Sequence, residues 1–113
     1  MNECVFCKII AGEIPGQKVF ENDQVAVIKD IKPVAPVHLL AIPKIHVANV
    51  CDARLLEGGL LQALYGAIGE VSRELKLREN GFRVVSNYGR DAGETVPHFH
   101  MHIIGGRMLE GMG

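Results

Sequence analysis

The chain has 113 residues, of which 12 are Lys or Arg and 13 are Asp or Glu, so its formal net charge at pH 7 is −1. This length suits one domain, and we expect residues 1–113 to fold as a single unit. The nearly balanced charge argues against a surface that binds nucleic acid through many phosphates. A small ligand fits this composition better.

The N-terminal segment and the cysteines indicate the compartment. The segment lacks the basic start and apolar centre of a signal peptide, and no apolar run approaches the ~20 residues that span a bilayer. We therefore expect no membrane contact and a cytoplasmic location. Cys4, Cys7 and Cys51 are an odd number of thiols. A disulfide framework is thus not expected, and Cys51 is most simply a small core residue.

The first third of the chain predicts one short helix and three strands. Residues 5–11 favour a helix, because a glycine and a proline that follow would stop it. Residues 18–21 and 24–29 are typical of two strands around an Asn-Asp turn. Residues 37–43 are apolar with little alternation, which indicates a strand covered on both faces or close to a ligand.

The clearest periodic pattern runs from Leu56 to Leu75, where apolar residues recur mostly at spacings of three and four. It predicts one long amphipathic helix. The stretch contains Gly58, Gly59, Gly66 and Gly69. Each glycine weakens a helix interior by about 1 kcal/mol relative to alanine. They indicate either a broken start of the helix or the close approach of another backbone, which this chain's own sheet or a dimer partner could supply.

Two further strands are predicted at the end of the chain. They cover residues 82–88 and 98–105, and a polar, glycine-containing loop at residues 89–96 joins them. Strands connected mostly by hairpins, with one long helix inserted, favour an α+β fold built on an antiparallel sheet.

The last of these segments contains histidines in strict alternation, His98, His100 and His102, with apolar residues between them. In a strand the three imidazoles would lie on one face while the apolar side chains enter the core. A neutral imidazole is a good nucleophile near pH 7, provided that one ring nitrogen donates a hydrogen bond and the other keeps its lone pair. Surface histidines or metal ligands are the alternative interpretation.

This pattern resembles the His-φ-His-φ-His-φ-φ signature (φ, apolar) of the histidine-triad (HIT) nucleotide hydrolases and transferases. Gly105-Gly106-Arg107 and the upstream pieces Ala35-Pro36-Val37-His38 and Ile42-Pro43-Lys44 are similar to its Hint branch. The resemblance implies an antiparallel sheet, a short N-terminal helix and a homodimer. It also implies that His100 attacks an α-phosphate to form a nucleotidyl-histidine, that His102 contacts the phosphate, and that His38 lies in the active site, where it could serve orientation alone.

The resemblance extends to a nucleotide site. Asn87 and the Gly93-Glu94-Thr95 loop would hold the phosphate, and the Thr95 hydroxyl could donate to the leaving group, although a plain hairpin turn is the alternative. Asp30, followed by Ile31, would bind the ribose hydroxyls, unless it only starts a turn. The apolar slot for the base would consist of Val5, Phe6, Ile9, Ile28 and Leu40.

A metal site competes for two of the histidines. Two thiolates spaced as Cys4-x-x-Cys7, with His46 as a third ligand, can build a tetrahedral zinc site. Some bacterial HIT proteins resemble this arrangement, with the first triad histidine, here His98, as the fourth ligand. Two buried cysteines on a short amphipathic helix are the alternative.

The expected function is that of a Hint-type hydrolase. Its substrates would be amides of purine nucleoside monophosphates, and it would hydrolyse their P–N bond. No organic cofactor is expected. Aliphatic walls around the base would give only a modest preference among purines. A dinucleoside polyphosphate hydrolase is the second enzyme hypothesis. A nucleotide-binding or zinc-binding adaptor without turnover is the alternative of another class.

Overall fold

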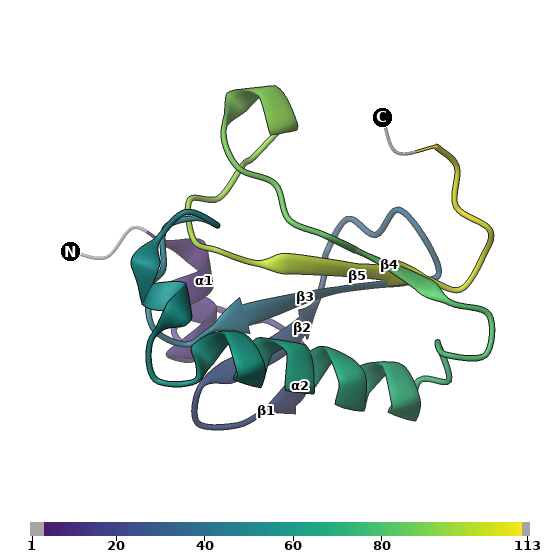
Figure 1. Ribbon diagram of the computed structural model, residues 1–113, viewed down its shortest axis with the longest axis horizontal. Helices are drawn as coiled ribbons and strands as arrows, with labels where there is room; N and C mark the ends of the chain where they lie inside the picture. Colours follow the sequence, from purple (N-terminus) through teal and green to yellow (C-terminus); the bar gives the residue numbers. More distant parts are fainter. Residues whose placement is uncertain (1–3, 112–113) are drawn as a thin grey trace.

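A five-stranded antiparallel sheet forms the centre of this computed structural model, which describes residues 4–111 (Figure 1). The strand order is β1-β2-β3-β5-β4, so β1 and β4 are the edge strands. The strands are β1 Lys18–Glu21, β2 Val25–Lys29, β3 Val37–Pro43, β4 Phe82–Val85 and β5 Met101–Gly105. Helix α1 (Val5–Ile10) and helix α2 (Leu60–Glu74) cover opposite faces, which confirms the α+β architecture.

The central strands β2 and β3 are buried on both faces, which explains their apolar sequences. Val27 and Leu39 belong to the larger core cluster beneath α2, whereas Ile28 and Leu40 belong to a smaller cluster with Phe6 of α1. Alternate residues of one strand therefore enter different cores. His38 of β3 has the same parity as Leu40 and so lies on the α1 side.

Helix α2 begins later than the sequence pattern predicts. It starts at Leu60, because Gly58 and Gly59 have φ angles of +60° and +72° that interrupt a right-handed helix. Leu56 falls in a preceding 3₁₀ turn, η1 (Ala53–Leu56), and is 79% exposed, so its place in the stripe was wrong. A Cβ on Gly66 would meet no atom within 4 Å, so this glycine does not pack against the chain's own sheet.

The last two strands are shorter than predicted. Strand β4 ends at Val85, and β5 begins at Met101, so His98 and His100 precede the strand. The ladder between β3 and β5 ends at the pair Ala41–Met101, shortly before Pro43, which has no N–H and is the last residue of β3. The N–H of Phe99 instead donates to the carbonyl of Val47 at 2.6 Å.

The alternation of faces nevertheless continues through the irregular part. Phe99, Met101 and Ile103 all belong to the core cluster beneath α2. The rings of His98 and His100 instead lie against Phe6, with ring centroids 5.8 and 4.9 Å from it. The predicted placement of the histidines on one side is therefore confirmed, although not by a continuous strand.

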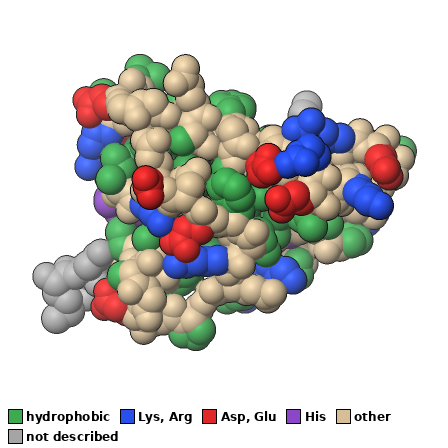
Figure 2. All heavy atoms as spheres, turned by 90° about the horizontal axis from the view of Figure 1, so that it is seen from below, with side chains coloured by type: hydrophobic (Ala, Val, Ile, Leu, Met, Phe, Trp, Pro, Cys, Tyr) green, Lys and Arg blue, Asp and Glu red, His purple; other side chains and the backbone are tan. Residues whose placement is uncertain are grey.

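Figure 2 views the molecule from below Figure 1, the side on which α2 lies. On this face acidic and basic side chains are interspersed, in keeping with the balanced charge of the whole chain. None of the helices within residues 4–111 combines the length and apolar character needed to cross a membrane.

Candidate active site and metal centre

Four histidines form a continuous cluster on the α1 side of the sheet. His38 lies on β3 and His102 on β5, while His98 and His100 lie in the segment that leads into β5. Ring centroids of His100 and His102 are 5.0 Å apart, and those of His38 and His102 are 5.1 Å apart. His102 is half-buried and the other three are buried. The fold thus brings together three of the predicted active-site residues, His38, His100 and His102.

His100 is held with one ring nitrogen engaged and the other open. Its Nδ1 lies 2.8 Å from the carbonyl oxygen of His98, and a carbonyl only accepts, so Nδ1 carries the proton. The lone pair is therefore on Nε2. Within residues 4–111 no hydrogen bond engages this atom, and no buried side-chain nitrogen lacks a partner, so Nε2 is open to solvent. This is the tautomer that a nucleophilic imidazole requires.

His38 and His102 form a directed chain of hydrogen bonds. The main-chain N–H of Val34 donates to Nδ1 of His38 at 3.1 Å, which places the proton of the neutral ring on Nε2. That Nε2–H faces Nδ1 of His102 at 2.9 Å. The proton of neutral His102 is consequently on its own Nε2. His102 is therefore a hydrogen-bond donor through Nε2, and its ring centroid lies 5.0 Å from that of His100.

Burial maintains the neutral form of His102. Burial, and to a smaller extent the neighbouring His100 and His38, lower the pKa of His102 to about 4, although Asp30 acts in the opposite direction. The ring is thus uncharged near neutral pH. Its Nδ1 can accept from His38 only in that form, so the direction of the chain depends on it.

We expect this shift to make stability depend on pH. Unfolded His102 takes up a proton near pH 6.5 and folded His102 only near pH 4, so the unfolded chain binds more protons between these values. The free energy of unfolding should therefore decrease as the pH falls from about 6.5 to about 4. Urea denaturation of metal-free protein should show a shallower decrease for His102→Asn. Burial also lowers the pKa of His98 to about 4, so the stability of His102→Asn should still depend on pH to some extent. Identical pH dependence in the two proteins would contradict the lowered pKa of His102.

Asp30 lies beside this chain and has two partners. Its Oδ1 accepts the N–H of Lys32 at 2.8 Å, as in a turn-starting aspartate. Its Oδ2 lies 3.3 Å from Nε2 of His38. The turn interpretation therefore has structural support, and the ribose contact of Asp30 stays a prediction. Ile31, which follows it, is 90% exposed.

The predicted phosphate loop is closed mainly by its own hydrogen bonds. The Glu94 carboxylate accepts the N–H of Gly89 at 3.1 Å, and the N–H of Glu94 donates to the carbonyl of Gly89 at 3.1 Å. Gly93 has φ +77° after a 3₁₀ turn, η2 (Arg90–Ala92). Asn87 is half-buried and Thr95 exposed. In the described part of the chain no hydrogen bond joins these residues to the histidines, so their phosphate contacts stay predictions.

Most of the residues predicted to surround the base lie together in a packed cluster. Phe6, Ile9, Ile28 and Leu40 lie in one cluster between α1 and the sheet. Val5 lies outside this cluster and is 37% exposed. The side of the cluster nearest His100 is formed by Phe6, whose ring stands edge-on to the imidazole. The base contact of these residues stays a prediction.

The predicted metal ligands also converge. One ligand atom from each of Cys4, Cys7, His46 and His98 lies within 4.8 Å of the others. Nδ1 of His98 is 3.2 Å from Sγ of Cys4 and 3.4 Å from Sγ of Cys7. Sγ of Cys7 is also 3.4 Å from Nδ1 of His46. Two sulfurs and two imidazole nitrogens in this arrangement fit a tetrahedral Zn²⁺ ion.

Hydrogen bonding separates this site from a second cluster of possible ligands, Asp30, His38 and His102. A metal-bound histidine usually donates its other ring N–H to an oxygen atom. Nε2 of His98 lies 2.9 Å from the carbonyl of Pro43, which leaves the Nδ1 lone pair for a cation. The second ring nitrogen of His38 instead accepts an N–H, which keeps a proton where the cation would bind. The first cluster therefore fits a metal and the second fits a proton relay.

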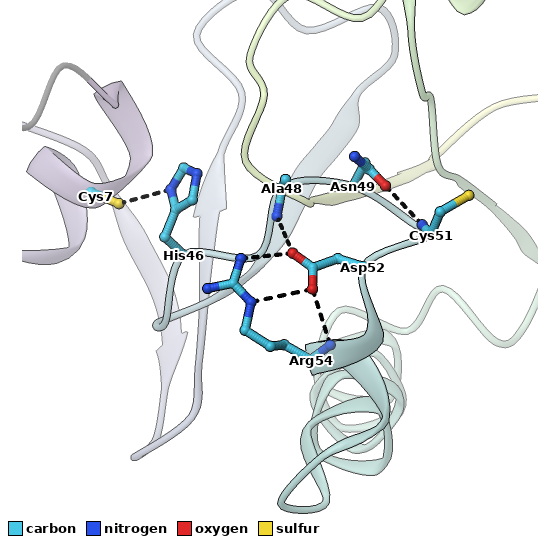
Figure 3. A network of polar contacts seen from close by, with 7 residues as sticks. All are labelled: Cys7, His46, Ala48, Asn49, Cys51, Asp52 and Arg54. Atoms are coloured by element: carbon cyan, nitrogen blue, oxygen red, sulfur yellow. Dashed lines mark hydrogen bonds and ion pairs between the residues drawn. The ribbon is translucent and has the colours of Figure 1, made fainter.

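The segment that carries His46 is fixed by hydrogen bonds to Asp52, which follows it in the chain (Figure 3). Asp52 accepts the N–H of Ala48 at 3.0 Å and pairs with the Arg54 guanidinium at 2.7 Å. These partners, Arg54 foremost, hold the pKa of the Asp52 carboxyl far below its ordinary range. Cys51 is exposed, so its expected place in the core was wrong, and its sulfur points away from Cys7.

Comparison with known proteins agrees with this geometry. A model of the HIT domain matches residues 11–109. The chain belongs to the HIT family. It is 36% identical over 107 residues to the purine nucleoside phosphoramidase of Escherichia coli K12, a match that covers 95% of this chain and 90% of that protein. The family confirms the resemblance that the histidine pattern indicated.

Solved structures of HIT proteins share the fold. A histidine triad protein from Clostridium difficile has a TM-score of 0.93 and 38% identity, covering 100% of this chain and 98% of the other. A HIT family hydrolase from Clostridium thermocellum has a TM-score of 0.92 and 41% identity, covering 99% and 97%. This HIT protein is therefore related to hydrolases along its whole length.

Sequence reasoning missed the main-chain partners of the histidines. The N–H of Val34 and the carbonyls of Pro43 and His98 decide which nitrogen of each ring carries a proton. A main-chain group has no residue-type signal, so only the fold could place it. The Gly-Gly-Arg segment after the histidines was a sequence signal near one of these contacts. Its Arg107 donates to the carbonyl of Val34 at 2.8 Å.

Proposed function

We propose that this HIT protein is a purine nucleoside 5′-phosphoramidate hydrolase that acts through a nucleotidyl-histidine intermediate. The observation that carries the proposal is the tautomer of His100, whose Nδ1–H is engaged while its Nε2 lone pair is open. The 36% identity to a purine nucleoside phosphoramidase supports the substrate class.

The reaction has two displacements at the α-phosphorus. Nε2 of His100 forms a bond to phosphorus, the P–N bond to the amine breaks, and the amine leaves after taking up a proton. A water molecule then attacks phosphorus, the bond to His100 breaks, and the nucleoside monophosphate and a proton are released. The neutral N–H of His102 donates to a phosphate oxygen as negative charge develops there.

The remaining site residues complete the proposal. Thr95 would donate to the leaving group, and Asn87, Gly93 and Glu94 would line the phosphate. Asp30 and Ile31 would contact the ribose, and the cluster around Phe6 would hold the base. We propose no organic cofactor, and a structural zinc ion at Cys4, Cys7, His46 and His98.

A fluorogenic adenosine phosphoramidate tests this function. Release of amine in a burst, followed by steady turnover, is expected because the covalent intermediate forms before water resolves it. A diadenosine polyphosphate should be cleaved far more slowly. Preference for the polyphosphate would favour the second enzyme hypothesis, and tight binding of adenosine monophosphate with turnover of neither substrate would favour an adaptor.

We also propose that the protein is a homodimer that uses the free edge of β4. Strand β1, the other edge, has an irregular register and a charged network in which Glu21 pairs with Lys18 and Lys44. Such features protect an edge from pairing. Strand β4 is regular and carries Val84, which is 39% exposed. The open surroundings of Gly66 on α2 leave room for a partner's backbone.

Light scattering at micromolar concentration should report twice the mass of the chain. A charge placed on the free edge should prevent association, so Val84→Lys is expected to be monomeric. The matched control is Val50→Lys, which changes another exposed valine far from β4 in sequence and should remain a dimer. A monomeric wild-type protein would contradict the proposal.

A further inference from the structure

The segment between β2 and β3 is fixed to the histidine cluster through one peptide unit. Residues 31–36 form no helix or strand and are mostly exposed. Within this segment the N–H of Val34 donates to Nδ1 of His38 at 3.1 Å. The carbonyl of Val34 accepts from Nη2 of Arg107 at 2.8 Å. Val34 is thereby held on both sides by side chains, although its own side chain is 59% exposed.

Arg107 is well placed to hold this segment. It follows β5 after Gly106, whose φ is +94°. A Cβ on Gly106 would lie 2.9 Å from the Cβ of Pro36, so the end of β5 passes directly against the segment. Nη1 of Arg107 also donates to the carbonyl of Met108 at 2.9 Å. The planar guanidinium therefore joins two carbonyls in a fixed direction, which a lysine ammonium would do less rigidly.

We propose that Arg107 is a positioning residue which, through the Val34 peptide, sets the proton positions on His38 and His102. The inference rests on the proposed function, because it concerns the donor that faces the phosphate. The order is Arg107 to the Val34 carbonyl, the Val34 N–H to His38, and the His38 Nε2–H to His102. His102 then keeps its own proton on Nε2.

Release of Val34 would permit the opposite order. Without a fixed donor at Nδ1, Oδ2 of Asp30, 3.3 Å from Nε2 of His38, is the remaining group that favours the proton on Nε2. A population of His38 can then carry its proton on Nδ1 and present a lone pair from Nε2 to His102. His102 would then place its proton on Nδ1 and turn a lone pair toward the phosphate, whose oxygens are also acceptors. The N–H that stabilises the developing charge would be lost, although no residue of the cluster had been changed.

Three variants test the proposal. Arg107→Gln removes the guanidinium, and Arg107→Lys keeps a donor that can reach one carbonyl. Arg83→Gln is the matched control, because Nη2 of Arg83 also donates to a main-chain carbonyl, that of Glu110 at 3.0 Å, but outside the segment 31–36. Since both arginines bond through surface guanidinium groups, all three variants should fold.

The decisive readout is the position of the ring protons, measured by long-range ¹H–¹⁵N NMR of the intact protein at pH 7. The wild-type protein and Arg83→Gln should carry the proton of His38 and of His102 on Nε2. Arg107→Gln should show a substantial population with the proton on Nδ1, and Arg107→Lys should lie between. An unchanged proton pattern in Arg107→Gln, or Nδ1–H on His38 in the wild type, would overturn the proposal.

Kinetics with the adenosine phosphoramidate give a second readout. Arg107→Gln should lower kcat about tenfold and leave KM within about twofold, as expected when a supporting hydrogen bond to an active-site histidine is lost. Arg83→Gln should change neither. If the wild-type protein does not hydrolyse the substrate, the proposed function fails, whereas the NMR comparison still decides the role of Arg107. Equal losses in both variants would overturn that role.

Discussion

His100→Ala should lower kcat/KM for a purine nucleoside phosphoramidate by about 10⁴-fold or more, because it removes a ring nitrogen whose lone pair is oriented and open. The covalent intermediate should disappear as well. Mass spectrometry of acid-quenched protein measures it directly as an acid-labile nucleotide adduct. Binding of adenosine monophosphate should persist, since the ribose, base and loop residues remain.

His102→Ala is the matched comparison, because it removes a neighbouring imidazole 5.0 Å away without removing the nucleophile. It should slow both displacements yet still form the adduct. An adduct of normal yield in His100→Ala would show that His102 or His38 attacks instead. Adduct formation in both variants would contradict the assignment of His100 and leave His38 as the nucleophile.

Cys4→Ser should lower thermal stability strongly, because Cys4 belongs both to the proposed metal site and to the start of α1. Sγ of Cys4 accepts the N–H of Cys7 at 3.4 Å at the N-cap of this helix. A structural zinc ion at about 1,000 times its dissociation constant would contribute about 4 kcal/mol. Its loss corresponds to a decrease of roughly 15 °C in Tm for a chain of this size.

Calorimetry with and without a chelator measures this effect, and elemental analysis should find about one zinc ion per chain. Cys51→Ser is the control, since Cys51 is exposed and outside the ligand set. It should match the wild type in both measurements. Chelation should lower Tm more than it lowers kcat. Substoichiometric zinc, or a chelator without effect on Tm, would contradict the metal site.

The sequence predicted the parts of the fold that depend on local patterns. Strands β1 and β3 have the predicted bounds, and α1 differs by one residue at its end. The predicted bounds were wrong where a residue distant in sequence determines whether a strand forms. The pattern at residues 98–105 alternates throughout, but pairing needs a neighbouring strand, and the ladder with β3 ends at the pair Ala41–Met101, before it reaches His100. No window of sequence around the histidines contains that information.

The candidate site shows the same division. The Cys-x-x-Cys spacing and the histidines predicted a set of four ligand atoms that the fold brings together. Residue types alone also permitted a cation at His38 and His102, and only the N–H of Val34 argues against it. For Glu94 the sequence predicted a phosphate-lining role but not the structural one. Its carboxylate accepts the N–H of Gly89 and so closes its own loop.

His98 takes part in both networks, but with different atoms. Its imidazole belongs to the candidate metal site, whereas its carbonyl orients His100. Every residue type has that carbonyl, so selection can act on the side chain at position 98 without altering the main-chain contact. A related chain that had lost both cysteines would therefore need only a buried residue of similar size there, and the first histidine of the motif would be free to diverge while the second remained fixed.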